Sequence, residues 1–180
     1  MKTSLKSRIA KIRLVIFDVD GVLTDGRIIV DDQAREIKNF HVLDGFGIVL
    51  LRKMGFKTAI ISARTTQAVV ARARDLKIDR VCEGALPKTN AYEGLLKEFK
   101  LKDEQVCFMG DDLTDLCLLK RVGLAVTVPN GVEEVKQIAH YVTKTRGGHG
   151  AVRELVELIF KSRGEWKRIV ESFSKDGVIK

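Results

Sequence analysis

The chain has 180 residues with a formal net charge of +8, and hydrophobic residues make up 45% of it. This length suits one domain with a substantial core, and the composition is typical of a folded globular protein rather than a disordered one. No apolar run approaches the roughly 20 residues that a membrane-spanning helix needs, and the basic amino terminus lacks the apolar segment of a secretion signal. We therefore expect residues 1–180 to form one cytoplasmic domain without a membrane partner.

The positive charge is spread along the chain rather than gathered in one stretch. The 32 basic and 24 acidic side chains are interspersed, and aromatic residues make up only 6% of the sequence. Proteins that bind single-stranded nucleic acid combine a basic groove with stacking aromatic residues, and this sequence lacks that pattern. A modest positive field suits a small anionic substrate instead, so we expect no nucleic-acid partner.

Apolar runs alternate with segments of helical periodicity. After a basic lead-in, strands are predicted at residues 13–17, 57–61, 80–82, 106–109, 124–128 and 141–143. Helices are predicted at residues 43–54, 66–76, 88–99, 112–120, 133–139, 150–160 and 165–173. Strands separated by helices form right-handed βαβ units around a parallel sheet. We therefore predict an α/β fold with a doubly wound, mostly parallel, Rossmann-like sheet.

One insertion, residues 27–42, interrupts this alternation. Residues 27–30 and 37–42 are predicted to form a β-hairpin around the polar segment 31–35. A lid domain would need on the order of 50 residues or more, which no gap between predicted elements provides. Because a two-stranded ribbon is marginal by itself, we expect it to pair with neighbouring chains in an oligomer whose subunits cap one another. A glycine-rich hinge at 147–150 and a helical tail at 150–180 complete a single domain without a cap.

The most informative feature is the pair Asp18 and Asp20, which follows the apolar run 14–17 and precedes Gly21. Side chains alternate along a strand, so both carboxylates leave the strand end on the same side. An Asp-x-Asp-Gly sequence also occurs as simple turn chemistry. Two converging carboxylates, however, are costly without a cation, and they suggest a metal, a nucleophile and a proton carrier in one place.

Three further polar segments follow predicted strands. They are the acidic cluster 110–115, the hydroxyl of Ser62 and the isolated cation Lys88. In an open parallel sheet, ligands bind outside the carboxyl ends of the strands. We therefore expect all four segments to meet at one edge, although Ser62 alone would suit a helix cap and Lys88 alone a surface charge.

These residue types suit the cleavage of a phosphate ester. We assign Asp18 as the nucleophile that forms an aspartyl-phosphate, and Asp20 as the general acid and base. Magnesium prefers oxygen ligands, which Asp18, Asp111 and the backbone carbonyl of Asp20 would supply. Ser62 and Lys88 are expected to bind the phosphoryl oxygens.

Three other residues of these segments are given supporting roles. Asp112 and Asp115 are expected to support the site, and Asp115 is placed to hold Lys88 or an outer-shell water. Arg64 is either a clamp for an anionic substrate or a simple charge at a helix start. The sequence alone does not separate these two roles for Arg64.

The motif 18–25 together with Ser62, Lys88 and the cluster 110–115 resembles the four motifs of the haloacid dehalogenase-like phosphohydrolases. With segments 44–48, 61–64 and 147–154, the chain is similar to the 3-deoxy-D-manno-octulosonate 8-phosphate phosphatase family over about residues 10–160. The resemblance implies a magnesium-dependent, capless homotetramer that hydrolyses this sugar phosphate in lipopolysaccharide synthesis. Thr24 and Asp25, within the first motif, are then expected to contact the substrate.

Alternative functions use similar residues. A phosphatase for a nine-carbon sugar acid phosphate, or for the phosphate at a nucleic acid end, would need the same catalytic groups. A phospho-receiver or binding module also combines clustered aspartates, magnesium and a lysine. Asp20 favours an enzyme, because a proton carrier two residues after the nucleophile serves turnover rather than stable phosphorylation.

Overall fold

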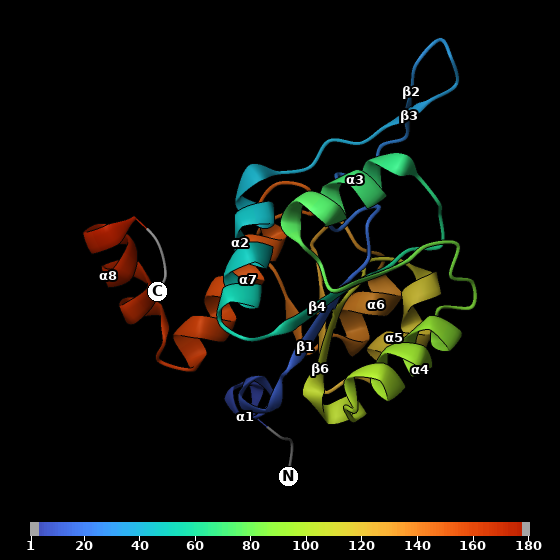
Figure 1. The fold of residues 1–180 in the computed structure, drawn as a ribbon. Helices are drawn as coiled ribbons and strands as arrows, with labels where there is room; N and C mark the ends of the chain where they lie inside the picture. The colour runs from blue at the N-terminus through green and yellow to red at the C-terminus, as the bar shows by residue number, and fades with distance from the viewer. Residues whose placement is uncertain (1–3, 178–180) are drawn as a thin grey trace.

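A six-stranded parallel sheet lies at the centre of the computed structural model, which describes residues 4–177 (Figure 1). The strands are β1 (Leu14–Phe17), β4 (Lys57–Ile61), β5 (Arg80–Cys82), β6 (Val106–Met109), β7 (Leu124–Thr127) and β8 (Tyr141–Val142). Their order across the sheet is β5-β4-β1-β6-β7-β8. The chain therefore builds outward from β1 to β5, returns to β6 on the other side of β1, and continues to β8. This reversal places the switch in strand order beside β1, where ligands bind in such sheets.

Helices cover both faces of the sheet (Figure 1). On one face lie α1 (Leu5–Lys11), α2 (Val42–Lys53), α3 (Gln67–Leu76), α7 (Ala151–Ser162) and α8 (Trp166–Asp176). On the other lie α4 (Lys88–Phe99), α5 (Leu116–Leu119) and α6 (Glu133–Ile138). The predicted doubly wound α/β architecture is confirmed. Within residues 4–177, no helix is both long and apolar enough to span a bilayer.

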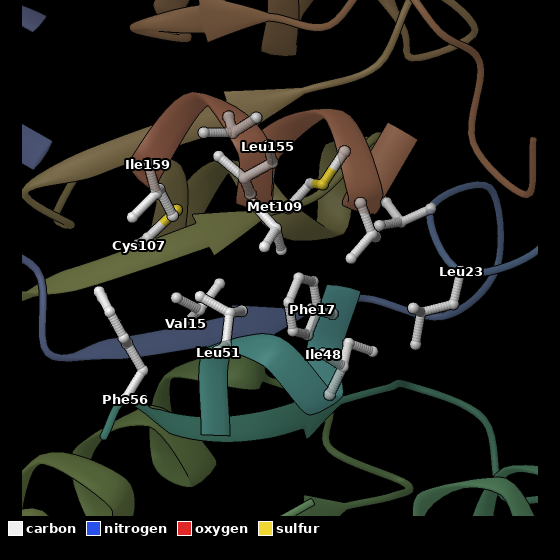
Figure 2. Close-up of a cluster of buried hydrophobic side chains, with 14 of the residues drawn as sticks. Val15, Phe17, Leu23, Ile48, Leu51, Phe56, Cys107, Met109, Leu155 and Ile159 are labelled. Carbon is white, nitrogen blue, oxygen red and sulfur yellow. The ribbon is translucent and has the colours of Figure 1, made fainter. Parts of the chain in front are cut away.

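Alternate residues of β1 enter two separate cores. Val15 and Phe17 pack with Leu51 and other residues of α2 and α7, as Figure 2 shows. Leu14 and Ile16 pack on the opposite face with residues of α4, α5 and α6. The period-two alternation of a strand thus buries all four residues of β1, and it fixes the position at which Asp18 leaves the sheet.

The predicted hairpin is present and projects from the rest of the molecule at the top of Figure 1. Its strands, β2 (Ile29–Val30) and β3 (Glu36–Ile37), are shorter than predicted and pair antiparallel. Ile28 and Val30 remain 60% and 55% exposed. The hairpin therefore offers apolar side chains that this subunit leaves uncovered.

The prediction of a lead-in before the first strand is wrong for the described residues, because α1 forms there. Ser4 caps this helix by accepting a hydrogen bond from the Ser7 N–H at 3.2 Å. Leu5, Ile9 and Ile12 follow a helical spacing and join the core. Interspersed basic residues hid this short apolar stripe. The prediction for residues 1–3 lies outside the described part of the chain.

Two further predictions are corrected by the packing of loops. The helix predicted at 112–120 is instead a 3-10 turn (Leu113–Asp115) followed by α5, because the Asp115 side chain turns back onto the preceding backbone. The segment 147–150 is no hinge, since the Gly148 N–H donates to the Val22 carbonyl at 2.9 Å. A Cβ at Gly147 would lie 1.8 Å from the Gly21 carbonyl oxygen, so the glycine permits this close contact.

Candidate active site

The turn after β1 holds Asp18 and Asp20 at the carboxyl edge of the sheet. The Asp18 N–H donates to the Met109 carbonyl at 2.9 Å, which extends the β1–β6 ladder by one residue. Gly21 then adopts a φ of +86°. A Cβ at this position would lie 2.0 Å from Asp111 Oδ2, so a glycine is needed for the turn to approach the second acidic cluster.

The second cluster surrounds a buried lysine. Lys88 is 1% exposed, and its Nζ lies 2.6 Å from Asp115 Oδ1 and 2.9 Å from Asp18 Oδ1. Asp115 Oδ2 accepts hydrogen bonds from the N–H groups of Asp111 (2.8 Å) and Asp112 (3.2 Å). Lys88 therefore joins the two acidic segments, and Asp115 fixes both the lysine and the loop that carries Asp111.

The carboxylates at this edge carry more negative charge than Lys88 balances. Burial and the neighbouring Asp115 raise the pKa of Asp18 to about 6, against the opposing effect of Lys88. Burial, Asp18 and Asp115 raise the pKa of Asp111 to about 8. Both shifts show that ionising these groups together is unfavourable without a further cation.

The same carboxylates fit a divalent metal ion. Asp18, Asp111 and Asp115 each offer an oxygen within 4.8 Å of the others. Asp111 Oδ1 is buried and has no hydrogen-bond partner among the described residues, whereas Asp115 is already engaged by Lys88 and the backbone. The hard oxygen donors of Asp18 and Asp111 suit magnesium, and the turn that carries the backbone carbonyl of Asp20 brings Gly21 close to Asp111.

A cavity of about 310 Å³ opens at this edge. Its walls bring together most of the residues predicted from the sequence: Asp18, Asp20, Ser62, Arg64, Lys88, Asp111 and Asp112. Ser62 follows β4, and its Oγ accepts a hydrogen bond from the Arg64 N–H at 3.2 Å. Asp112 caps the following 3-10 turn by accepting a hydrogen bond from the Leu113 N–H at 2.8 Å. The four predicted segments therefore meet at one edge, as the topology requires.

Thr24 and Asp25 lie outside this cavity. The buried Thr24 hydroxyl bonds within its own loop, with the Gly26 N–H at 3.3 Å and the Val19 carbonyl at 3.3 Å. Asp25 lines a neighbouring cavity with Arg27 and Arg146. The structure thus gives Thr24 a role in holding the loop after β1, and the substrate contacts expected of Thr24 and Asp25 stay predictions.

Two residues of the hairpin were not identified from the sequence. Lys38 Nζ lies 2.5 Å from Asp20 Oδ1, and Glu36 Oε2 accepts a hydrogen bond from Arg64 at 2.8 Å. The only available signal was a pair of oppositely charged residues two positions apart, with Lys38 in the predicted arm 37–42 and Glu36 just before it. Such pairs are common on exposed hairpins, so the pattern by itself indicates nothing about a site.

Comparisons with known proteins agree with this geometry. Residues 77–155 match the family model of the haloacid dehalogenase-like hydrolases. The chain is 43% identical over 152 residues to the 3-deoxy-D-manno-octulosonate 8-phosphate phosphatase KdsC of Yersinia pestis, covering 84% of this chain and 81% of that protein. The similarity therefore extends over more than four-fifths of each protein.

Solved structures give the same result. A probable YrbI family phosphatase from Pseudomonas syringae superposes with a TM-score of 0.92 at 43% identity, over 95% of this chain and 97% of that chain. The 3-deoxy-D-manno-octulosonate 8-phosphate phosphatase of Moraxella catarrhalis, solved with magnesium, phosphate and KDO, gives a TM-score of 0.91 at 36% identity, over 93% of this chain and 97% of that chain. Both likenesses extend over more than nine-tenths of this chain.

Proposed function

The chain belongs to the 3-deoxy-D-manno-octulosonate 8-phosphate phosphatase family of haloacid dehalogenase-like hydrolases, and from this membership we infer its reaction. It hydrolyses 3-deoxy-D-manno-octulosonate 8-phosphate to the free sugar acid and phosphate, with magnesium as cofactor. The observation that carries this inference is the meeting of Asp18, Asp111 and Lys88 at the wall of one cavity. A nucleophile, a metal ligand and a phosphate-binding cation are thereby within reach of one phosphoryl group.

In the first step, a carboxylate oxygen of Asp18 attacks phosphorus and the bond from phosphorus to the sugar oxygen breaks. Asp20 gives a proton to the departing alkoxide. In the second step, Asp20 takes a proton from water, which attacks the aspartyl-phosphate and releases phosphate. Lys88 and Ser62 bind the phosphoryl oxygens throughout, and both line the same cavity as the two aspartates.

Asp18, Asp111 and the backbone carbonyl of Asp20 would hold the magnesium ion. When bound, the ion neutralises negative charge on the phosphoryl group and on the attacking carboxylate. Asp115 orients this set, since it anchors Lys88 and the backbone of the Asp111 loop. Asp112 lines the cavity and shapes the same loop.

The alternatives differ in substrate or in turnover. A phosphatase for a nine-carbon sugar acid phosphate would need the same catalytic groups. The two substrates differ only in the leaving group, which we place near Arg64 in the cavity wall. A phospho-receiver would retain its phosphate, whereas Asp20 at the cavity wall provides the proton transfers that release it. The position of Asp20 therefore favours a phosphatase.

The assembly and the compartment also belong to this proposal. A homotetramer is supported by the projecting hairpin, whose Ile28 and Val30 are exposed in the subunit. A cytoplasmic location is supported by three free cysteines, which suit a reducing compartment. The released sugar acid would then be used in lipopolysaccharide synthesis.

The inferred reaction is tested by phosphate release from a panel of sugar phosphates. We expect magnesium-dependent release from 3-deoxy-D-manno-octulosonate 8-phosphate with a higher kcat/KM than from nine-carbon sugar acid phosphates. Asp18→Asn should lower kcat by about 10³-fold or more, because it removes the nucleophile. Asp75→Asn is the control and should retain activity, because Asp75 lies on α3, pairs with Arg72 and does not line the cavity. A preference for a nine-carbon substrate would refute the assigned substrate but not the phosphatase chemistry.

A further inference from the structure

A buried lysine of the hairpin contacts the acid that the reaction uses. Lys38 directly follows β3, and its side chain is 1% exposed. Its Nζ lies 2.5 Å from Asp20 Oδ1 and 2.7 Å from Glu36 Oε1. An ammonium group is rarely buried unless its charge is paired, so this lysine is held in place by its two carboxylate partners.

The second partner, Glu36, is itself fastened on its other side. Arg64 Nη2 lies 2.8 Å from Glu36 Oε2, so Glu36 bridges Arg64 and Lys38. Burial lowers the pKa of Lys38, but the bonds to Asp20 and Glu36 outweigh it and raise that pKa above its usual value. The ammonium group therefore stays charged, and its position is set by the base of the hairpin.

The two oxygens of the Asp20 carboxyl group have different surroundings. Oδ1 accepts a hydrogen bond from Lys38, whereas the nearest guanidinium nitrogen of Arg64 lies 3.8 Å from Oδ2. That distance is too long for a hydrogen bond. Asp20 thus lines the cavity with one oxygen engaged by Lys38 and the other without so close a cation.

We propose that Lys38 is a positioning residue that holds Asp20 Oδ1, so that Oδ2 is presented to the leaving oxygen of the substrate. The proposal rests on the inferred phosphatase reaction and goes beyond it, because it gives the hairpin a part in proton transfer. A shift of about 1 Å in a catalytic group costs as much as 10²-fold in rate. Lys38 prevents such a shift by fixing the side-chain rotamer of Asp20.

The test compares two leaving groups in Lys38→Met. The sugar alkoxide needs a proton to leave, whereas p-nitrophenolate leaves without one. We expect kcat/KM, which reports the reaction up to departure of the leaving group, to fall by about 10²-fold for the sugar phosphate and by less than about 3-fold for p-nitrophenyl phosphate. The later attack of water also uses Asp20, so kcat itself should fall for both substrates. An equal loss of kcat/KM with both substrates would overturn the proposal, because it would show a general structural defect.

Three companion variants sharpen this test. Lys38→Arg keeps the charge and should restore part of the lost kcat/KM for the sugar phosphate. Lys57→Met is the matched control, because Lys57 also pairs with an aspartate, Asp79 at 2.8 Å, but lies on the exposed start of β4. Adding Lys38→Met to Asp20→Asn should cause no further loss, since residues that act through one group are not additive. Full additivity would refute the positioning role.

The outcomes also separate this proposal from the inferred function. Failure of the wild-type protein to hydrolyse 3-deoxy-D-manno-octulosonate 8-phosphate would refute the substrate alone. The comparison would then use glucose 6-phosphate as the alkyl phosphate, and its ratio to p-nitrophenyl phosphate would still decide the role of Lys38. If Lys38→Met does not fold, Lys38→Gln, which keeps a polar group, is measured by the same ratio.

Discussion

At the scale of single residues, the site is a cluster of carboxylates whose charge is only partly balanced. Asp111 shows this most clearly, because its Oδ1 is buried and finds no partner among residues 4–177. Burial and the adjacent Asp18 raise its pKa to about 8. In the metal-free protein, this carboxyl group therefore keeps its proton at pH values where an ordinary aspartate has lost it.

This raised pKa predicts how stability depends on pH. Between about pH 4 and pH 8, the unfolded chain releases the Asp111 proton while the folded protein keeps it, so the free energy of unfolding falls as pH rises, by up to about 1.4 kcal/mol per pH unit. Magnesium binds only the ionised carboxylate and should offset this loss. We therefore expect magnesium to raise Tm more at pH 8 than at pH 6. Thermal unfolding of the metal-free and magnesium-loaded protein at both pH values measures this difference.

The control for this prediction is Asp111→Asn, which keeps the shape of the side chain without its titration. It should flatten the pH dependence of the metal-free protein and abolish most of the rise in Tm with magnesium. Asp25→Asn, in the neighbouring cavity, should retain both effects. An equal magnesium effect at both pH values would contradict the assignment of Asp111 as a ligand.

At the scale of elements, α8 is separate from the chemistry. Its residues pack on α2 and α7, where the Phe173 ring contacts Phe46 at a centroid distance of 5.4 Å. None of the residues that line the catalytic cavity comes from this helix. We therefore interpret α8 as a stabilising extension of the α2–α7 layer, beyond the segments that carry the motifs.

This interpretation predicts that stability and catalysis separate in α8. Ile169→Ala removes a buried side chain and should lower the free energy of unfolding by about 2 kcal/mol. Val170→Ala changes the neighbouring exposed residue and should cost much less. Denaturant unfolding measures the first effect, and kcat should stay at the wild-type value for both variants. A large fall in kcat for Ile169→Ala at a temperature where it is folded would connect α8 to the site.

At the scale of the whole molecule, the hairpin carries apolar side chains that a single subunit leaves exposed. It projects from the sheet in Figure 1, and Ile28 and Val30 face solvent. Exposed apolar groups on a marginal two-stranded ribbon favour contact with another copy of the chain. The base of the same hairpin carries Lys38, so assembly and catalysis share one structural element.

We therefore predict that Ile28→Ser combined with Val30→Ser lowers the mass measured by light scattering from that of a tetramer towards that of a monomer. Serine at both positions removes apolar area that would be buried at the subunit interface, and this weakens association. Val170→Ser, which changes an exposed apolar residue of α8 instead, should leave the mass unchanged. A wild-type protein that is monomeric at working concentration would contradict the proposed assembly.

The sequence by itself determined the sheet and the meeting of Asp18, Asp111, Ser62 and Lys88, because apolar runs define strands and the ends of parallel strands share one edge. Only the tertiary structure decided three sets of contacts. They are the pairing of Lys38 with Asp20, the hydrogen bonds of the Thr24 hydroxyl within its loop, and the packing of segment 147–150 against the loop after β1. The physical reason is that local periodicity encodes elements and their burial. Contacts between loops depend instead on close approach and polar pairing, which leave no repeating pattern in the sequence.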